Sequence, residues 1–463
     1  MLRPVNKMPP EILSRIARYV PDEYAVGTKQ IIPLTHVCRY WRESIVSALE
    51  HWTRITCCQT THLTALSLMR SKAAPLQLSL RTAAIRRRGP GFCDLIRPYI
   101  QNIETLLFDD LGQIEDLTRT LPNFPRSTPN LRSLELRYMQ YNCWDPTWDL
   151  LTDPFELFPD TLRSLSLDHI PLYPSFLRLK TLTELSLDLN TVHPPLDTLL
   201  DFLEENRSLQ SVDLTIIPKG APTPILERRV AIMDQLRHLS ITSSDVIIAR
   251  TLISNVSLRR GAHLGITFRD SGTRVGLRDI LSGVSLTHLS NLPSPTFMEC
   301  DSCPLVVRLV GPNGSFSYTH GWSSGTPFAL FPMLPLANLR ELRLVGSSPY
   351  TEFHPPSLPA LETLAVQYNT NVSRLFSTLF PSNSSFPSLT TLGFLNCNIT
   401  EEFMKRLSGL ASARKRTASA QLHRVVIVHR DGKFPRVASI NKLKRRVPIV
   451  DVQLGEMLPA DLT

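Results

Sequence analysis

The chain has 463 residues, of which 42% are hydrophobic and 20% are charged, and its formal net charge is +9. This length is too great for one compact core, so we expect two or three domains or one elongated repeat array. The composition is typical of a folded protein, and the absence of a run of about 20 apolar residues predicts no transmembrane helix.

The N-terminal 55 residues carry two short amphipathic patterns. Pro9–Pro10 opens a first predicted helix with apolar side chains at Ile12, Leu13, Ile16 and Val20. A second helix is predicted from apolar side chains at offsets of three and four, namely Leu34, Val37, Cys38, Trp41 and Ile45. Two or three small helices cannot bury so many apolar side chains by themselves, so we expect them to dock on something else.

These residues resemble an F-box, in the form that is abundant in large fungal families. The opening of the motif is matched by Met8, Pro9, Pro10, Glu11, Ile12 and Leu13. Its middle is matched by Leu34, Val37, Cys38, Arg39, Trp41 and Arg42, and its end by Trp52 and Ile55. Met8 stands where Leu is more usual, and the loop from Pro21 to Pro33 is longer than in compact F-boxes.

The resemblance implies a substrate-recognition subunit of a Skp–cullin–F-box ubiquitin ligase. The helices would bind a Skp-type adaptor and, through it, a cullin, with Trp41 as an aromatic anchor. The adaptor-binding residues expected on this basis are Met8, Pro9, Pro10, Ile12, Leu13, Ile16, Val20, Leu34, Val37, Cys38 and Trp41.

From about residue 75 onward the pattern LxxLxL recurs, often with Asn or Cys three residues later. The clearest copies begin at Leu182, Leu361 and Leu389. Weaker copies begin at Ile103, Leu131, Leu162, Leu209, Leu236 and Leu339, and further strands are predicted at Pro75–Leu80, His263–Phe268 and Arg424–Val428. Most steps between copies fit the period of about 20–29 residues of leucine-rich repeats, which these copies resemble. Such irregular repeats often follow an F-box.

This pattern predicts an α/β fold in which alternating leucines enter the core and the residues between them form a second, polar face. We expect an irregular leucine-rich-repeat solenoid, with parallel strands on its concave face and helices and loops on its convex face. Residues 196–203 are a predicted helix with Leu199, Phe202 and Leu203 on one face, and the Asn or Cys at each bend is expected to bond the neighbouring turn. Ordinary amphipathic strands of a globular α/β protein are the alternative.

Two regions depart from the repeat. Residues 291–335 are rich in Pro and Gly and predict an insertion with a hairpin near Leu305–Val310 and Ser315–Thr319. The C-terminal part predicts a basic helix at Val437–Arg446 and a strand at Ile449–Leu454. The predicted domains are therefore an F-box at 1–56, a linker helix at 57–74, and the repeat solenoid at 75–463.

The charge and motif content favour a protein-binding role. The basic clusters Arg86–Arg88, Arg414–Arg416 and Lys442–Arg446 lack interleaved aromatic residues, so we interpret them as solvated surface and do not expect a nucleic acid partner. The polar face mixes both charge signs and predicts a protein target of unknown identity. Its outward residues are Glu135, Arg137, Ser166, Asp168, Glu184, Asp188, Asp213, Thr215, Ser240, Thr242, Arg343 and Gln367.

Catalytic motifs are missing from the sequence, including those for phosphate binding, zinc hydrolysis and serine hydrolysis. The lone Cys300–Cys303 pair lacks the second pair that a structural zinc needs, and Asp168–His169 has no neighbouring nucleophile in a motif. We therefore predict a non-enzymatic, cytoplasmic and/or nuclear protein without cofactor, metal or membrane contact. The alternatives are a leucine-rich interaction scaffold outside ubiquitination, whose N-terminal helices cap the repeats or self-associate, and a hydrolase or transferase with a concealed site.

Overall fold

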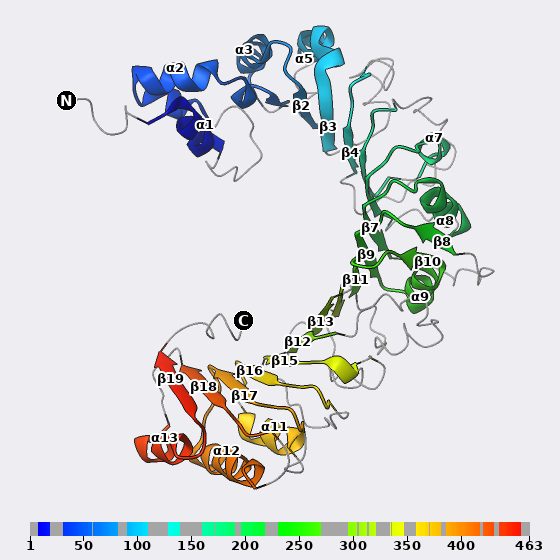
Figure 1. Cartoon of the computed structure of the whole chain (residues 1–463). Coiled ribbons are helices and arrows are strands. Elements are labelled where there is room, and N and C mark those ends of the chain that lie inside the picture. The colour runs from blue at the N-terminus through cyan, green and yellow to red at the C-terminus, as the bar shows by residue number, and fades with distance from the viewer. Residues whose placement is uncertain are drawn as a thin grey trace. The chain divides into compact units, whose positions relative to one another are not determined.

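The chain forms two compact units, Met1–Lys219 and Gly220–Thr463. A computed structural model describes residues 8–18, 31–57, 59–81, 90–109, 128–138, 160–170, 172–189, 196–217, 230–269, 295–302, 305–312, 314–320, 334, 336–346, 358–369, 371–380, 386–416, 420–429 and 435–454. Each unit contains helices and a mostly parallel sheet, and Figure 1 labels many of these elements. The predicted α/β class is confirmed, with helices first and a large parallel sheet after them.

The first unit begins with helices and continues as strands alternating with helices. Its helices are α1 (Pro10–Arg18), α2 (Arg39–Ser47), α3 (Thr61–Ser71), α5 (Pro90–Ile96), α7 (Pro174–Leu177) and α8 (Leu196–Glu205). Its strands are β1 (Arg54–Thr56), β2 (Leu76–Arg81), β3 (Ile103–Asp109), β4 (Ser133–Arg137), β5 (Ser164–Asp168), β6 (Glu184–Asp188) and β7 (Ser211–Ile216). Short 3-10 helices cover Pro33–His36, Leu49–His51 and Arg97–Asn102.

These strands pair in chain order from β1 to β7, and each pairing is parallel. The register places apolar side chains opposite one another along the sheet. One such row is Leu106, Leu134, Leu165, Leu185 and Val212, and the next is Phe108, Leu136, Leu167, Leu187 and Leu214. A single row of this kind buries side chains that no isolated strand and helix could bury.

The second unit carries the remaining elements. Its helices are α9 (Val246–Asn255), α11 (Val372–Leu379), α12 (Glu401–Arg414) and α13 (Val437–Lys444), with a 3-10 helix at Leu336–Asn338. Its strands are β8 (Ala231–Met233), β9 (His238–Ser243), β10 (Val256–Leu258), β11 (His263–Phe268), β12 (Phe297–Ser302), β13 (Leu305–Gly311), β14 (Gly314–His320), β15 (Glu341–Val345), β16 (Thr363–Gln367), β17 (Thr391–Leu395), β18 (Arg424–His429) and β19 (Ile449–Leu454).

The main sheet of the second unit has the order β9, β11, β14, β13, β12, β15, β16, β17, β18, β19. Strand β13 is antiparallel to both of its neighbours, and the other pairs are parallel. The hairpin predicted near 305–319 is therefore confirmed as β13 and β14. Strands β8 and β10 form a separate parallel pair.

The first residue of each LxxLxL copy lies in the core. All nine positions have 0% solvent exposure: Ile103, Leu131, Leu162, Leu182, Leu209, Leu236, Leu339, Leu361 and Leu389. The predicted helix at 196–203 is α8, and Leu199, Phe202 and Leu203 are buried as expected. The C-terminal strand was predicted correctly, and the basic helix ends at Lys444, two residues earlier than predicted.

Successive copies are joined by a repeated hydrogen bond that the sequence analysis missed. The residue before the first leucine donates its hydroxyl to a leucine carbonyl of the preceding copy. Thr161 donates to Leu131 O at 2.9 Å, Thr181 to Leu162 O at 2.8 Å, and Ser208 to Leu182 O at 2.7 Å. These bonds support the register between neighbouring turns because each one joins equivalent positions of successive copies.

The bends after the strands are also repeated. His169, Gly346, Tyr368 and Asn396 each follow a strand, adopt positive φ, and donate their N–H to the next strand in the sheet. The predicted contact of a bend side chain with the neighbouring turn is confirmed at two sites. Asn369 Nδ2 donates to Gly346 O at 3.3 Å, and Cys397 Sγ donates to Val366 O at 3.3 Å.

Helices α11, α12 and α13 lie along one face of strands β15 to β19 (Figure 1). Aromatic rings connect this helical layer to the sheet. Phe403 of α12 lies 5.1 Å from Phe394 of β17 and 5.2 Å from Phe376 of α11, both in edge-on arrangements. The leucine side of the sheet is thus the core side, and the opposite side is the polar face.

Arg414 corrects the prediction that the cluster Arg414–Arg416 is solvated surface. Its side chain is fully buried at the end of α12. Its guanidinium donates to three backbone carbonyls, those of Phe386 at 2.8 Å, Leu389 at 2.9 Å and Ala420 at 3.2 Å. One basic residue therefore ties together the loops on either side of β17.

None of the helices in the described part of the chain is long and apolar enough to cross a lipid bilayer.

Replacing Arg414 with Met keeps most of the side-chain volume but removes the donors to three buried carbonyls. We expect this variant to destabilise the second unit by about 2 kcal/mol or more, because hydrogen bonds to charged groups are individually worth about 1.5–3 kcal/mol. Amide hydrogen exchange in β17 and β18 measures the effect. The control is Arg416→Met, since Arg416 is exposed; equal exchange in the two variants would contradict the role given to Arg414.

Candidate functional site

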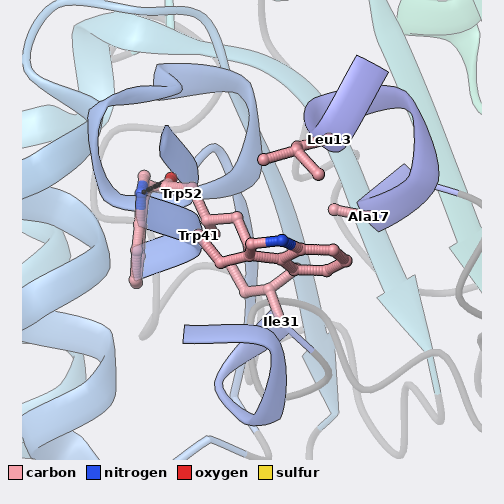
Figure 2. Close-up of a cluster of buried hydrophobic side chains, with 6 residues drawn as sticks. Leu13, Ala17, Ile31, Trp41 and Trp52 are labelled. Atoms are coloured by element: carbon pink, nitrogen blue, oxygen red, sulfur yellow. Dashed lines mark hydrogen bonds between the residues drawn. The ribbon is translucent and has the colours of Figure 1, made fainter. Parts of the chain in front are cut away.

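The N-terminal helices enclose a small core of their own. Leu13 and Ala17 of α1 meet Trp41 and Ile45 of α2, together with Ile31 and Trp52 (Figure 2). Met8, Leu34, Cys38, Tyr40, Val46 and Leu66 pack around this core and are partly buried. We call the described residues 8–57 the head. Backbone bonds from Ile12 and Leu13 to the Pro9 carbonyl start α1, where proline is favoured because it needs no N–H partner.

Trp52 connects the head to the next helix. Its indole N–H donates to Ile45 O at 3.3 Å, and the Arg70 guanidinium of α3 lies 4.3 Å above its ring. Leu66, also on α3, packs against the same core. Strand β1, at the end of the predicted F-box segment, pairs with β2 of the sheet. The domain boundary predicted at residue 56 stays a prediction. Trp52 and β1 before it contact α3 and β2 after it.

Helix α1 presents two apolar pairs on adjacent faces. Leu13 and Ala17 lie one turn apart and are buried in the head core. Ile12 and Ile16 are also one turn apart, but they are 41% and 38% exposed. The apolar stripe read from the sequence is therefore wider than the core needs, and its outer half faces solvent. Val20 lies outside the described residues.

The remaining predicted adaptor-binding residues are also divided between the core and the surface. Val37, just before α2, is 54% exposed, and Pro9 and Pro10 are exposed at the start of α1. Met8, Leu34 and Cys38 are half-buried against the core. Trp41 was expected to be an interface anchor, but it lies inside the head core between α1 and α2. The adaptor-binding role of these residues stays a prediction, and the structure separates those that are accessible from those that are not.

Polar contacts that the sequence did not predict close the head on its other side. Ser14 Oγ donates to Glu50 Oε1 at 2.6 Å and lies 3.0 Å from His51 Nε2, which ties α1 to the 3-10 helix Leu49–His51. Tyr40 donates its hydroxyl to Met8 O at 2.6 Å. The sequence contains these residues at separations of more than 30 positions, so no local pattern could have paired them.

The polar face of each sheet is the second candidate surface. The residues predicted to point outward are exposed or half-exposed with one exception, Arg343, which is buried. Arg343 lies 3.0 Å from Glu341 and 3.5 Å from Glu299, with its guanidinium 5.1 Å from the centre of the Phe297 ring. Glu299 also pairs with Arg308 at 3.4 Å. These charges neutralise one another, so Arg343 is a structural residue of β15.

Two histidines stack on the polar face of β9 and β11. The rings of His238 and His263 are 5.0 Å apart and nearly parallel. His263 Nδ1 lies 2.7 Å from Ser315 Oγ, and Ser317 Oγ lies 3.2 Å from His263 Nε2. Burial lowers the pKa of His263 from its ordinary value, and the charges of His238 and Arg308 lower it further. Although a serine and a histidine are in contact here, both imidazole nitrogens already meet hydroxyls of the same strand, so no activated nucleophile is evident.

Asp168, His169 and Asp188 are the one group of potential metal ligands in the described part of the chain. Their ligand atoms lie within 4.8 Å of one another at the ends of β5 and β6. His169 Nε2 is 3.5 Å from an Asp168 oxygen, and its Nδ1 is 4.0 Å from an Asp188 oxygen. Cys300 is buried, and burial raises the pKa of its thiol; Cys303 lies outside the described residues.

A family model described as F-box-like matches residues 5–58 of the chain, which include α1, α2 and β1. No curated protein matches the chain. The F-box-like domain predicted from the sequence is therefore confirmed and supports an F-box protein. F-box domains generally bind Skp-type adaptors, and their presence suggests a part in substrate recognition by ubiquitin ligases of the Skp–cullin–F-box type.

Leu13 and Ile12 provide a matched pair for testing whether α1 has one face in the head core and one face in solvent. We expect Leu13→Ala to destabilise the head by about 2–5 kcal/mol, as for other buried leucines. Ile12→Ala should cost less than about 1 kcal/mol because its side chain is already exposed. The measurement is hydrogen-exchange protection of the α2 amides, and equal loss of protection in both variants would contradict the two-sided helix.

We expect the stability of the second unit to decrease in acid because of His263. In the unfolded chain a histidine takes up a proton near pH 6.5, whereas folded His263 does so only at lower pH. The stabilisation is complete above pH 6.5 and decreases as the pH falls through that value toward the folded pKa. Thermal unfolding between pH 7.5 and 5 should show a shallower pH dependence in His263→Gln than in the control His423→Gln, whose side chain is exposed. Parallel profiles in these two variants would rule out this contribution.

Proposed function

We propose that this protein is the substrate-recognition subunit of a Skp–cullin–F-box ubiquitin ligase. The observation that carries the proposal is the exposed apolar set Ile12, Ile16 and Val37 on a head that matches the F-box-like family. These side chains leave the head core complete without them, so they are available to a second chain. Burying them in an interface would be favourable at about 25 cal/mol per Å² of apolar surface.

In this proposal the head has two sides with different tasks. Leu13, Trp41 and Trp52 hold the helices together, while Pro9, Pro10, Ile12, Ile16 and Val37 bind the adaptor, which in turn binds a cullin. Trp41 contributes to adaptor binding only indirectly, because it packs against α1 inside the head core. Half-buried Met8, Leu34 and Cys38 form the border between the two sides.

We further propose that residues 75–463 are an irregular leucine-rich-repeat solenoid. The support is the exclusion of nine equivalent apolar positions from solvent, the leucine-to-leucine register, and the hydroxyl bonds between successive turns. The polar face of the strands would be the concave face and would bind the target protein. Its exposed residues of both charge signs suit a polar protein surface.

The chain itself would carry out no chemistry. Tethering a target near a ubiquitin-loaded enzyme raises the local concentration of its lysines, which is sufficient for transfer by the other subunits. The absence of catalytic motifs from the sequence is consistent with this non-enzymatic role. A cytoplasmic and/or nuclear location is part of the same proposal.

One observation favours the alternative of a scaffold whose head caps the repeats. Strand β1 pairs with β2, and Trp52 is covered by Arg70 and packs in a core that Leu66 joins, so the end of the head continues directly into the sheet. This contact is compatible with adaptor binding because it uses the β1 side of the head, while Ile12, Ile16 and Val37 stay exposed.

Adaptor capture tests the proposal. We expect the full chain to retain a purified Skp-type adaptor in a pull-down, and Ile12→Ser/Ile16→Ser to reduce capture at least tenfold, which corresponds to about 1.4 kcal/mol of binding free energy. The control is Ile232→Ser, an exposed isoleucine on β8 that should leave capture unchanged. Both variants should keep the thermal stability of the parent.

Undiminished capture by Ile12→Ser/Ile16→Ser would remove these residues from the adaptor surface. Failure of the parent chain to bind any Skp-type adaptor would favour the scaffold alternative.

A further inference from the structure

Exposed cations gather at the ends of two neighbouring helices in the second unit. Helices α12 and α13 lie side by side (Figure 1). Lys442, Lys444 and Arg445 are exposed at the end of α13, and Lys415 and Arg416 are exposed just after α12. We call these five residues the basic surface.

The packing of α13 on α12 brings the two groups of cations together. The guanidinium of Arg446 donates to the carbonyl of Ser408 at 2.6 Å and to its hydroxyl at 2.8 Å. Lys415 follows Ser408 by seven residues, which is about 10 Å along a helix axis. The cations at the two helix ends are therefore separated by distances comparable to the screening length of about 10 Å at 0.1 M salt.

The carboxylates of α12 lie at its opposite end and are already paired. Glu401 is 3.8 Å from Arg436, and Glu402 is 2.7 Å from Arg406. Residues 437–448 include no Asp or Glu. Among the residues that the structure describes, no carboxylate forms an ion pair with the basic surface.

Stabilisation of the helix ends does not account for all of these charges. The helix dipole favours a cation in the last turn, but like charges three or four residues apart repel each other. Lys442 stands in this relation to both Arg445 and Arg446. The carbonyls of Asn441 and Leu443 already accept the backbone N–H groups of Arg445 and Arg446, so they need no lysine donor. The basic surface therefore carries a repulsion that an external anion would relieve.

We propose that the basic surface binds an acidic segment of another protein, with a run of Asp and Glu side chains facing the five cations. Charge complementarity selects such a partner. The basic surface includes no aromatic ring on which a nucleic acid base could stack. It also includes no large apolar side chain that could enter a lipid layer, and the exposed Val437 lies at the opposite end of α13.

The position of the basic surface separates this partner from the target. Helices α11 to α13 lie on the leucine side of the strands, whereas the target would bind the polar face on the other side. The acidic partner and the target can therefore bind at the same time. This consequence rests on the proposed function, but binding of the acidic segment does not.

Fluorescence anisotropy with a labelled poly-glutamate peptide tests the proposal. We expect the full chain to bind this peptide with an affinity that decreases as the NaCl concentration is raised. Lys442→Gln/Lys444→Gln/Arg445→Gln should bind the peptide at least about tenfold more weakly, because three of the five cations are removed. Its thermal stability should equal that of the parent, since all three side chains are exposed.

The matched control is Arg237→Gln/Arg259→Gln/Arg260→Gln. It removes the same number of positive charges from other exposed residues of the second unit and should bind the peptide as the parent does. Equal weakening in the two triple variants would show that only net charge matters and would overturn the proposal. Undiminished binding by the α13 variant would overturn it as well.

A carbodiimide, which couples carboxylates to lysines in direct contact, locates the bound peptide. We expect cross-links at Lys415, Lys442 or Lys444, and cross-links confined to other lysines would contradict the proposal. A single-stranded oligonucleotide and vesicles of anionic phospholipid are tested beside the peptide, and tighter binding of either one at the same residues would overturn the assignment of a protein partner. Adaptor capture by the head is measured in parallel and should not change in the α13 variant, so failure of this inference and failure of the proposed function give different results.

Discussion

The stacking of buried leucines against one another is the constraint on which both units depend. Each LxxLxL segment contributes a strand too short to be stable alone, and its leucines leave water only when the next strand is in register. Full burial of one leucine side chain is worth about 1.5–3 kcal/mol relative to exposure. A register shift of one residue would turn all the leucines of a strand to the solvent face and lose this stabilisation for each of them. The hydroxyl bonds from Thr161, Thr181 and Ser208 act on the same register, since each joins one segment to the one before it.

The head is also stabilised by burial of apolar side chains, but in a much smaller core made by short helices. Its helices are too short to enclose a large core, yet two tryptophans and a few aliphatic residues give it a closed interior. Helix α1 has more apolar surface than that interior can take, and the surplus is Ile12 and Ile16. An exposed apolar pair on a small helix is unfavourable in isolation, so its presence agrees with a surface that is buried in a complex.

The polar faces of the sheets differ in composition along the chain. Strands β4 to β7 expose single polar residues between buried leucines, and β12, β13 and β15 hold a self-neutralising group around Arg343 and Glu299. Strands β16 to β18 carry a buried apolar cluster of Ala365, Leu395, Val426 and Val428. Only the exposed polar positions offer contacts to a protein without prior rearrangement. The accessible part of the face is therefore smaller than the number of strands suggests.

Several features of the protein were predictable from the sequence, because they depend on local periodicity. The strands of the LxxLxL copies, the hairpin at β13 and β14, and helix α8 follow from spacing within about ten residues. The F-box-like segment was predicted from the resemblance of residues 8–55 to a known motif. Contacts between side chains that are far apart in the sequence could not be predicted from local periodicity. Ile12 and Leu13 are neighbours with the same chemistry, and only the packing of α1 on α2 decided that one is core and the other surface. Likewise, Arg414 and Arg343 read as solvated charges until the fold placed buried carbonyls and carboxylates around them, since those partners come from distant positions in the sequence.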